Sequence, residues 1–207
     1  KDYKYSKVNN GFIYKDNTGE MNLPYPNLLG DFQISNVSTA IATIRNLNQF
    51  KIRESHIRNA ITKIKSEGRL QFIKEGKLRK YVSNENEILI DGGHNPLAAK
   101  AIEKYLGCLN PEKKIIMLLG MMANKDHKEF IQIFKHRVHS IITLDIPNQI
   151  NFINKEKLSK IAKSCGVASN AENSIELALK KISEKNNNAI IFCTGSLYFA
   201  GEILNLN

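Results

Sequence analysis

The stretch EILIDGGHNPLAAKAIEKYL, residues 87–106, predicts a buried strand, a polar turn and then a helix. The short apolar run that ends at Ile90 suits a strand inside a sheet. Pro96 suits the first turn of a helix, and Asn95 before it is a good cap. The turn Asp91-Gly92-Gly93-His94 puts a carboxyl group and an imidazole at the strand's end. Taken alone, the stretch fits a ligand site and a plain capped turn equally well.

The same alternation of apolar strand and amphipathic helix continues to the end of the chain, which predicts a parallel sheet covered on both faces. We therefore expect an α/β fold with a Rossmann-like domain over residues 67–207. A short β-pair is expected before it, at 69–73 and 77–83 around Glu75-Gly76. Further strands are expected at 87–90, 113–120, 139–146 and 188–196, and helices at 97–109, 125–136, 154–166, 173–185 and 197–204.

The first portion of the chain, residues 1–66, has a different pattern. Residues 11–24 predict a β-hairpin, with its turn at Asn17-Thr18-Gly19. Two helices follow: one begins at a Ser35 cap, and the other covers 53–65 and ends at Gly68. This is too little sheet to bury two helices. We therefore expect the tail of a larger domain, with an exposed apolar face that favours aggregation.

Polar turns follow three of the predicted strands. In open α/β sheets, ligands bind beyond the carboxyl ends of the strands. We therefore expect side chains from these turns to share one rim, although each turn also has an interpretation as a simple helix cap. The candidates are Asp91, His94, Lys125, Asp126 and Ser196. Arg69, near the domain boundary, is either a further anion contact or a solvated arginine at a helix end.

Composition excludes several classes of protein. The net charge is +10, but the lysines are scattered rather than gathered in a stripe with aromatic residues, so we expect no nucleic-acid partner. No apolar run is long enough to span a bilayer, and the polar start has no signal-peptide pattern. Three widely spaced cysteines predict reduced, buried thiols in a cytoplasmic protein without a zinc site.

Five stretches together resemble one family, the folylpolyglutamate synthase/dihydrofolate synthase family of the Mur ligase superfamily. They follow the order and approximate spacing of the family's C-terminal part, and they cover essentially the whole chain. The stretches are LLGDFQISNVSTAIATI, GRLQ, ILIDGGHNPLAAKAIEKYL, GMMANKD and CTGSLYFAGEIL.

The resemblance implies ligation of L-glutamate to dihydropteroate or a folate, with ATP and Mg²⁺, through an acyl phosphate. It also implies a Rossmann-like C-terminal Mur ligase domain preceded by a remnant of the central ATPase domain. By matching motifs, Asn36, Arg69 and Asp91 are implied as ATP contacts. His94 and Ser196 are implied on the glutamate side of the cleft.

Two departures from the family's pattern matter. Phe32 stands where the family usually has histidine, before Gln33. The phosphate-binding motif G-x-x-x-x-G-K-[ST] does not occur in these 207 residues. The chain alone should therefore not transfer a phosphoryl group, and the Mg²⁺ ligands are expected outside it.

Three hypotheses stay open. The chain belongs to an intact ligase or works with a separate N-terminal ATPase half, or it is an inactive split-gene relic that is only a folded binding domain. An unrelated Rossmann-type nucleotide-binding module would be expected to carry a glycine-rich fingerprint after its first strand, and none is present.

Overall fold

The computed structural model describes residues 2–47 and 49–207. The chain forms two compact units, Lys1–Glu67 and Gly68–Asn207. The interpretation of the first unit as part of an ATPase domain stays a prediction. None of the helices in the described residues is long and apolar enough to cross a membrane.

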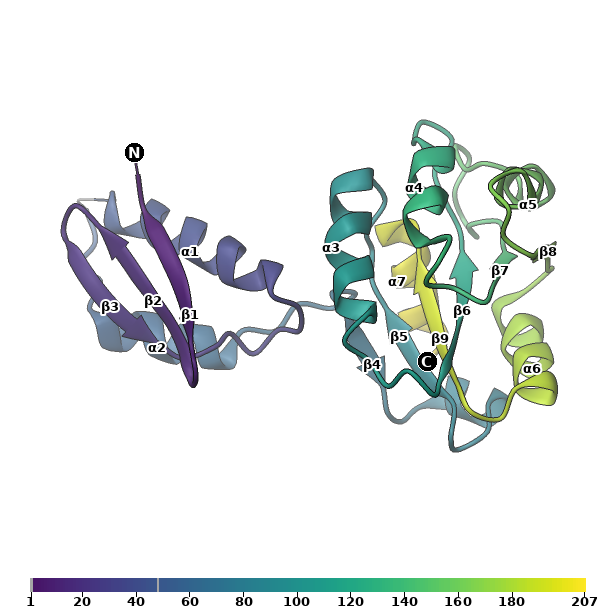
Figure 1. Ribbon diagram of the computed structural model, residues 1–207, viewed down its shortest axis with the longest axis horizontal. Helices are drawn as coiled ribbons and strands as arrows, with labels where there is room; N and C mark the ends of the chain where they lie inside the picture. The colour runs from purple at the N-terminus through teal and green to yellow at the C-terminus, as the bar shows by residue number, and fades with distance from the viewer. Residues whose placement is uncertain (1, 48) are drawn as a thin grey trace. The chain divides into compact units, whose positions relative to one another are not determined.

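The first unit combines a three-stranded antiparallel sheet with two helices (Figure 1). The expected hairpin is confirmed, with Asp16 opposite Gly19 in the register, and a third strand pairs with it along the chain's start. Apolar residues of the sheet and both helices share one small core, which includes Phe12, Ile41 and Ile57. The elements are β1 (Lys4–Val8), β2 (Gly11–Asp16), β3 (Gly19–Leu23), α1 (Phe32–Arg45) and α2 (Glu54–Lys63).

Two predicted helix boundaries in this unit, the start of the first helix and the end of the second, were wrong. Helix α1 begins at Phe32, not after a Ser35 cap, because the chain turns at Gly30, whose φ is 93°, and enters the helical conformation at Asp31. Helix α2 ends at Lys63 rather than at Gly68. The helix ends there because the next residue, Ile64, has a ψ of 135°, which makes the chain extended.

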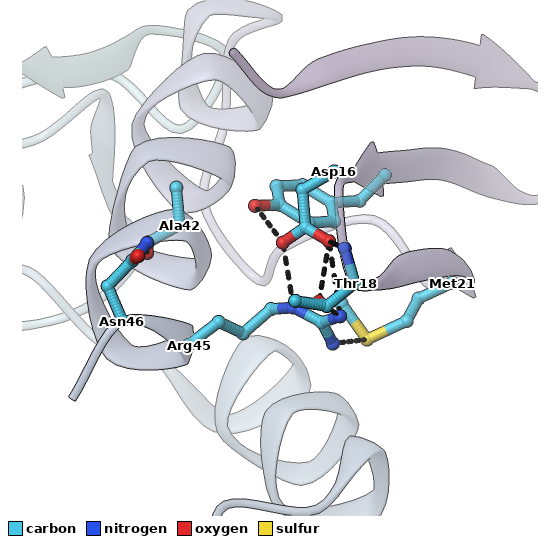
Figure 2. Close-up of polar contacts among 7 residues, drawn as sticks. Asp16, Thr18, Met21, Ala42, Arg45 and Asn46 are labelled. Carbon is cyan, nitrogen blue, oxygen red and sulfur yellow. Dashed lines mark hydrogen bonds and ion pairs between the residues drawn. The ribbon is translucent and has the colours of Figure 1, made fainter. Parts of the chain in front are cut away.

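A partly buried ion pair ties the end of α1 to the β2–β3 turn (Figure 2). Arg45 donates from Nε to Asp16 Oδ2 at 2.8 Å and from a terminal nitrogen to Oδ1 at 3.2 Å. Thr18 donates to the same carboxylate from its backbone N–H and its hydroxyl, and the Tyr14 hydroxyl donates to Oδ2 at 3.1 Å. Burial, followed by this hydrogen bond to Asp16, raises the pKa of Tyr14 to about 12. The carboxylate is therefore the centre of a network that joins strand and helix.

The second unit contains a six-stranded sheet of order β4-β5-β9-β6-β7-β8, in which only β4 runs antiparallel to its neighbour. This confirms the expected α/β, mostly parallel architecture. The strands are β4 (Gln71–Ile73), β5 (Glu87–Ile90), β6 (Lys114–Leu119), β7 (Ser140–Thr143), β8 (Ser169–Ala171) and β9 (Ala189–Thr194). The helices are α3 (Pro96–Leu106), α4 (His127–Phe134), α5 (Lys155–Ser164), α6 (Ile175–Lys185) and α7 (Leu197–Leu206).

Helices cover both faces of this sheet, as continuous apolar strands require. Alternate residues of β5, Ile88 and Ile90, share a core with apolar residues of α6 and α7. On the other face, Phe134 of α4 packs against Phe192 of β9 with ring centroids 5.9 Å apart. Helices α3 and α4 lie side by side over the near face in Figure 1.

The expected β-pair at 69–73 and 77–83 was wrong in its second half. Strand β4 pairs with β5, with Gln71 opposite Ile90. Residues Lys77–Tyr81 form a 3₁₀ helix, η1, instead of a strand. The physical reason lies in tertiary contacts. The backbone N–H groups of Lys77 and Leu78 donate to Asn207, at 3.0 and 3.3 Å, and the Leu78 side chain is buried in the core.

Two smaller features differ from the sequence analysis: one strand was missed, and one cysteine is exposed rather than buried. Strand β8 was not predicted, because its three residues, Ser-Asn-Ala, carry no apolar pattern. Cys165 and Cys193 are buried, but Cys108 is exposed, because it follows the end of α3 on the surface.

Candidate functional site

The turns after β5 and β9 are joined directly by hydrogen bonds. These strands are parallel neighbours, so their carboxyl ends meet at one edge of the sheet. The carbonyl oxygen of Gly93 accepts from the Gly195 N–H at 3.0 Å and from the Thr194 hydroxyl at 3.3 Å. The Asp91–His94 turn and the turn that contains Ser196 therefore form one continuous rim, as the sequence predicts.

Gly195 makes this junction sterically possible. Its φ is 106°, which side chains rarely adopt, and a Cβ there would lie 2.6 Å from the Gly120 carbonyl oxygen. The Gly120 N–H in turn donates to Thr194 O at 3.2 Å, which links the turn after β6 to the same rim. Three strand ends therefore meet around one glycine.

Asp91 is buried, with an exposed fraction of 2%. Its Oδ1 accepts from the Gly93 N–H at 2.7 Å, and its Oδ2 accepts from the Leu70 N–H at 3.0 Å. Burial raises the pKa of Asp91, against the opposing effects of these two amides and of the Arg69 charge. In this structure both carboxylate oxygens are used to hold the backbone.

Arg69 lies between two residues that are bonded to the rim. The Gly92 N–H donates to Gly68 O at 2.8 Å, and Leu70 is bonded to Asp91. The Arg69 side chain is half-buried, and within residues 2–47 and 49–207 it makes no ion pair. Its guanidinium fork therefore remains available to an anion.

His94 is half-buried, and its Nδ1 lies 3.1 Å from Gly92 O. A carbonyl oxygen only accepts hydrogen bonds, so the neutral ring carries its proton on Nδ1. This arrangement leaves Nε2 as a hydrogen-bond acceptor. His94 is thus suited to receive a hydrogen bond from a cationic group.

Two helices begin at this rim. Asn95 caps α3 by accepting from the Ala98 N–H at 2.9 Å, and Pro96 occupies the helix's first position, as predicted. Ser196, with an exposed fraction of 2%, caps α7 by accepting from the Tyr198 N–H at 3.1 Å. Helix N-termini favour negative charge, so both favour an anionic ligand at this edge.

Replacing Asn95 by alanine should destabilise the second unit by about 1 kcal/mol, because the Ala98 N–H loses its side-chain acceptor. Asn95→Asp keeps the acceptor, so the stability of the second unit should fall by at most a few tenths of about 1 kcal/mol. Urea unfolding of the three proteins checks the order, and equal losses in both variants would show that the cap is not the stabilising contact.

The other predicted residues fall into two groups. Asp126 caps α4, accepting from the Glu129 N–H at 2.9 Å, and Lys125 before it is half-buried, so this turn is a helix cap that retains a cation. Asn36 lies in the first unit, exposed on α1, where its side-chain amide donates to Gln33 Oε1 at 3.0 Å. The structure therefore brings together Arg69, Asp91, His94 and Ser196 but leaves Asn36 in a different unit.

Sequence reasoning missed the backbone partners of this site, Leu70 and Gly93. Their N–H groups carry no signal in residue type. Leu70 has a φ of 45°, unusual for a residue with a side chain. Within the described part of the chain, no three His, Cys, Asp or Glu side chains lie together in a way that could hold a metal ion.

The family model described as "Mur ligase, glutamate ligase domain" matches residues 68–197. Among curated proteins, the dihydrofolate synthase/folylpolyglutamate synthase of Buchnera aphidicola is 28% identical over 208 residues, covering 99% of this chain and 46% of that protein. The dihydrofolate synthetase of Saccharomyces cerevisiae is 23% identical over 98% of this chain and 50% of its own length. The chain thus spans about half the length of these relatives.

Solved structures show the same fold. The structure titled E. coli FolC in complex with DHPP and ADP aligns with a TM-score of 0.77 at 19% identity, over 99% of this chain and 45% of that one. The folylpolyglutamate synthase/dihydrofolate synthase of Yersinia pestis aligns with a TM-score of 0.78 at 18% identity, over 98% of this chain and 45% of that one. The chain therefore belongs to the Mur ligase family, with its glutamate ligase domain over residues 68–197.

Proposed function

We propose that this chain supplies the C-terminal part of an ATP-dependent ligase that joins L-glutamate to dihydropteroate or a folate. The observation that carries the proposal is the rim in which Gly93 O receives hydrogen bonds from Thr194 and Gly195. This rim joins an arginine without an ion pair among the described residues, a histidine acceptor and two helix N-termini at the carboxyl edge of a Mur ligase sheet.

In this proposal, the rim binds the nucleotide and glutamate, while the phosphate loop and the Mg²⁺ ligands lie outside these 207 residues. The carboxylate of the pteroate or folate takes the γ-phosphoryl group of ATP, and the glutamate amine then displaces phosphate to form the amide. In the second unit, Arg69 would contact the nucleotide phosphates, with Asp91 beside it. In the first unit, Asn36 is proposed as an ATP contact on the basis of the family motif alone. The α3 and α7 N-termini would favour the carboxylates of glutamate, and Ser196 would line that side.

His94 would contact the incoming amine. Its Nε2 is the accepting nitrogen, because Nδ1 is used toward Gly92 O. A protonated amine that donates to Nε2 would be oriented for attack once it loses a proton. His94 would thereby act on glutamate and leave nucleotide binding unaffected.

The missing phosphate loop and Mg²⁺ ligands would come from an N-terminal ATPase half, either in the same polypeptide or as a separate chain. The coverage of about half of each curated relative supports this division. An apolar groove of about 410 Å³ between α1 and α2 also supports it, because a groove lined almost entirely by apolar side chains is suited to such a partner. Its lining includes Val37, Ile44, Ala60 and Ile64.

The first experiment is antibody capture of the protein from its native cells, followed by intact mass and assay of the captured material. A mass near 23.4 kDa together with a co-captured ATPase half would indicate a two-chain enzyme. A mass of roughly twice that value, as two domains of ordinary size predict, would indicate one longer ligase. In both cases we expect phosphate release that requires ATP, dihydropteroate or folate, and L-glutamate.

Captured protein of 23.4 kDa without partner or turnover would favour the relic. In that case the chain folds and binds ligands but does not catalyse ligation. ATP hydrolysis that L-glutamate does not accelerate and that yields no amide product would contradict the proposal in both forms.

Replacing His94 by alanine in the captured or reassembled enzyme should raise the KM for L-glutamate about 10- to 100-fold, as the loss of one hydrogen bond to a charged group predicts. The KM for ATP should stay unchanged. His136→Ala is the matched control, because His136 is exposed on the α4–β7 connection, away from the rim. An equal change in both KM values would assign His94 to general stability of the rim.

A further inference from the structure

Helix α7 is held by hydrogen bonds at both of its ends. At the rim, the Gly195 N–H donates to Gly93 O at 3.0 Å, and Ser196 caps the helix. At the other end, Asn207 contacts the turn between β4 and η1, which lies at the amino end of the neighbouring strand β5. At 1.5 Å per residue, the ten residues of α7 separate these two contacts by about 15 Å. The helix thus connects the rim to the opposite edge of the sheet.

The Asn207 side chain bridges two backbone groups of the β4–η1 turn. Its Nδ2 donates to Glu75 O at 3.1 Å, and its Oδ1 accepts from the Leu78 N–H at 3.3 Å. The Asn207 carbonyl oxygen also accepts from the Lys77 N–H, at 3.0 Å. An amide side chain both donates and accepts, whereas a carboxylate only accepts. Asparagine therefore matches this turn in a way that aspartate of the same shape does not.

Gly76 leaves the space that the Asn207 side chain occupies. Its φ is 109°, a conformation that residues with side chains rarely adopt. A Cβ at Gly76 would lie 2.5 Å from Asn207 Cγ, too close for both groups to keep their positions. The turn and the asparagine therefore fit together as a specific contact rather than as a chance surface hydrogen bond.

The rest of α7 is held mainly by apolar contacts. Phe199, Ala200 and Ile203 enter the core of the second unit. Apolar burial has no preferred direction, so these contacts do not by themselves fix the helix along its own axis. On the exposed side, Glu202 accepts a long hydrogen bond from Asn148, at 3.3 Å. The contacts best placed to fix the axial position are thus those at the two ends of the helix.

We propose that Asn207 is a positioning residue, which holds α7 along its axis from the end remote from the rim. By doing so it keeps the turn of Gly195 and Ser196 bonded to Gly93. Asn207 lies outside the five stretches that resemble the family, so the resemblance assigns it no role. The inference rests on the proposed function only in taking Ser196 as part of the glutamate site, and the first test therefore uses no ligand.

The first test is NMR of the full chain, which reports on the folded state at the rim. Asn207→Ala removes both side-chain hydrogen bonds, and we expect the amide signals of Gly195 and Tyr198 to shift. The Gly195 amide should also exchange its hydrogen about tenfold faster, as the loss of about one net hydrogen bond predicts. Asn207→Asp keeps the acceptor for Leu78 but loses the donor to Glu75, so it should have a smaller effect in the same direction.

Asn186→Ala is the matched control. Asn186 follows α6, which packs into the same core as α7, but its side chain donates to Ile182 O at 3.4 Å, within its own helix. This variant should leave the Gly195 and Tyr198 signals in place. Unchanged signals in Asn207→Ala, or equal shifts in Asn186→Ala, would overturn the positioning role. If Asn207→Ala does not fold, Asn207→Asp decides by the same criteria.

The second test uses the captured or reassembled ligase. Asn207→Ala should raise the KM for L-glutamate about three- to tenfold, because a displaced α7 moves Ser196, while the KM for ATP stays unchanged. Shifted rim signals with an unchanged KM for L-glutamate would support the positioning role and contradict the glutamate site at Ser196. Absence of turnover in the wild type would contradict the proposed function, and the NMR signals would then decide the positioning role.

Discussion

Replacing Gly195 by alanine should destabilise the second unit by about 3–5 kcal/mol, combining backbone strain with overpacking. The φ of 106° disfavours any side chain, and the new Cβ would lie 2.6 Å from Gly120 O, 2.7 Å from Met121 Cγ and 2.8 Å from Leu119 Cδ1. Strand β6 and its following turn are buried, so the closest of these atoms, a backbone oxygen, has no free space to move into. Urea unfolding, monitored by hydrogen exchange of the second unit, measures the loss.

The matched control is Gly201→Ala, six residues further along the chain in the interior of α7. A Cβ at Gly201 has no neighbour within 4 Å. Alanine should therefore stabilise the helix by up to about 1 kcal/mol through its better helix propensity. The same chemical change is thus expected to have opposite signs at the two sites. A loss of less than about 1 kcal/mol for Gly195→Ala would show that the rim repacks and that its geometry is not fixed by this glycine.

The Gly195 substitution should also affect the candidate site before the unit unfolds. The Gly195 N–H is one of the two donors to Gly93 O, so displacing it separates the turn of Ser196 from the turn of His94. In the captured ligase we expect a larger KM for L-glutamate under conditions where the variant is still folded. An unchanged KM in the folded variant would mean that the junction of the two turns does not shape the glutamate site.

The strand-turn-helix at residues 87–106 was predictable because local signals agree there. Ile88 to Ile90 form a short apolar strand, Asn95 has the side chain of a cap, and Pro96 fixes the backbone angle of a first helical turn. The alternation of strands and helices that follows gave the parallel sheet for the same reason. The rim then followed from topology, because the ends of parallel neighbouring strands meet.

The errors arose where tertiary contacts override local pattern. Residues Lys77–Tyr81 resemble a strand, but they form a 3₁₀ helix that buries Leu78 and whose first N–H groups donate to Asn207. The two hydrogen bonds that Asp91 accepts were not predictable. Their donors are the backbone N–H groups of Gly93 and Leu70, and Leu70 adopts a left-handed conformation. Asn36 was suggested by the family resemblance alone, and it lies in the first unit, whereas Asp91, His94 and Ser196 lie in the second.

Replacing Asp16 should destabilise the first unit. Asp16→Ala removes the partner of Arg45, whose side chain is 21% exposed and would be left partly buried without its counter-ion. Removal of one partner from a fully buried pair costs about 3–5 kcal/mol, so this partly solvated pair should lose about 2–3 kcal/mol. Hydrogen exchange of peptides from residues 2–47 measures the loss in the first unit separately from the second.

An exposed ion pair between β2 and β3 provides the control for the Asp16–Arg45 pair. Lys15 and Glu20 are cross-strand partners 3.6 Å apart, with side chains 67% and 53% exposed. Glu20→Gln should change the stability by no more than about 0.5 kcal/mol, because solvent screens an exposed pair. Equal losses for Asp16→Ala and Glu20→Gln would show that burial does not strengthen the Asp16–Arg45 pair.

The pH dependence distinguishes the charge of Asp16 from its shape. Burial alone would raise the pKa of Asp16, but hydrogen bonds from Thr18 and Tyr14 and the Arg45 charge outweigh burial and lower it below its ordinary value of 3.8. The unfolded chain therefore takes up the proton first as pH falls, so the stabilisation is complete above about pH 5 and is lost as pH falls through the lowered pKa. Wild type and Asp16→Asn should differ most between about pH 5 and 7 and converge toward pH 2. A difference that persists unchanged at pH 2 would mean that the carboxylate stabilises the hairpin by packing and not by its charge.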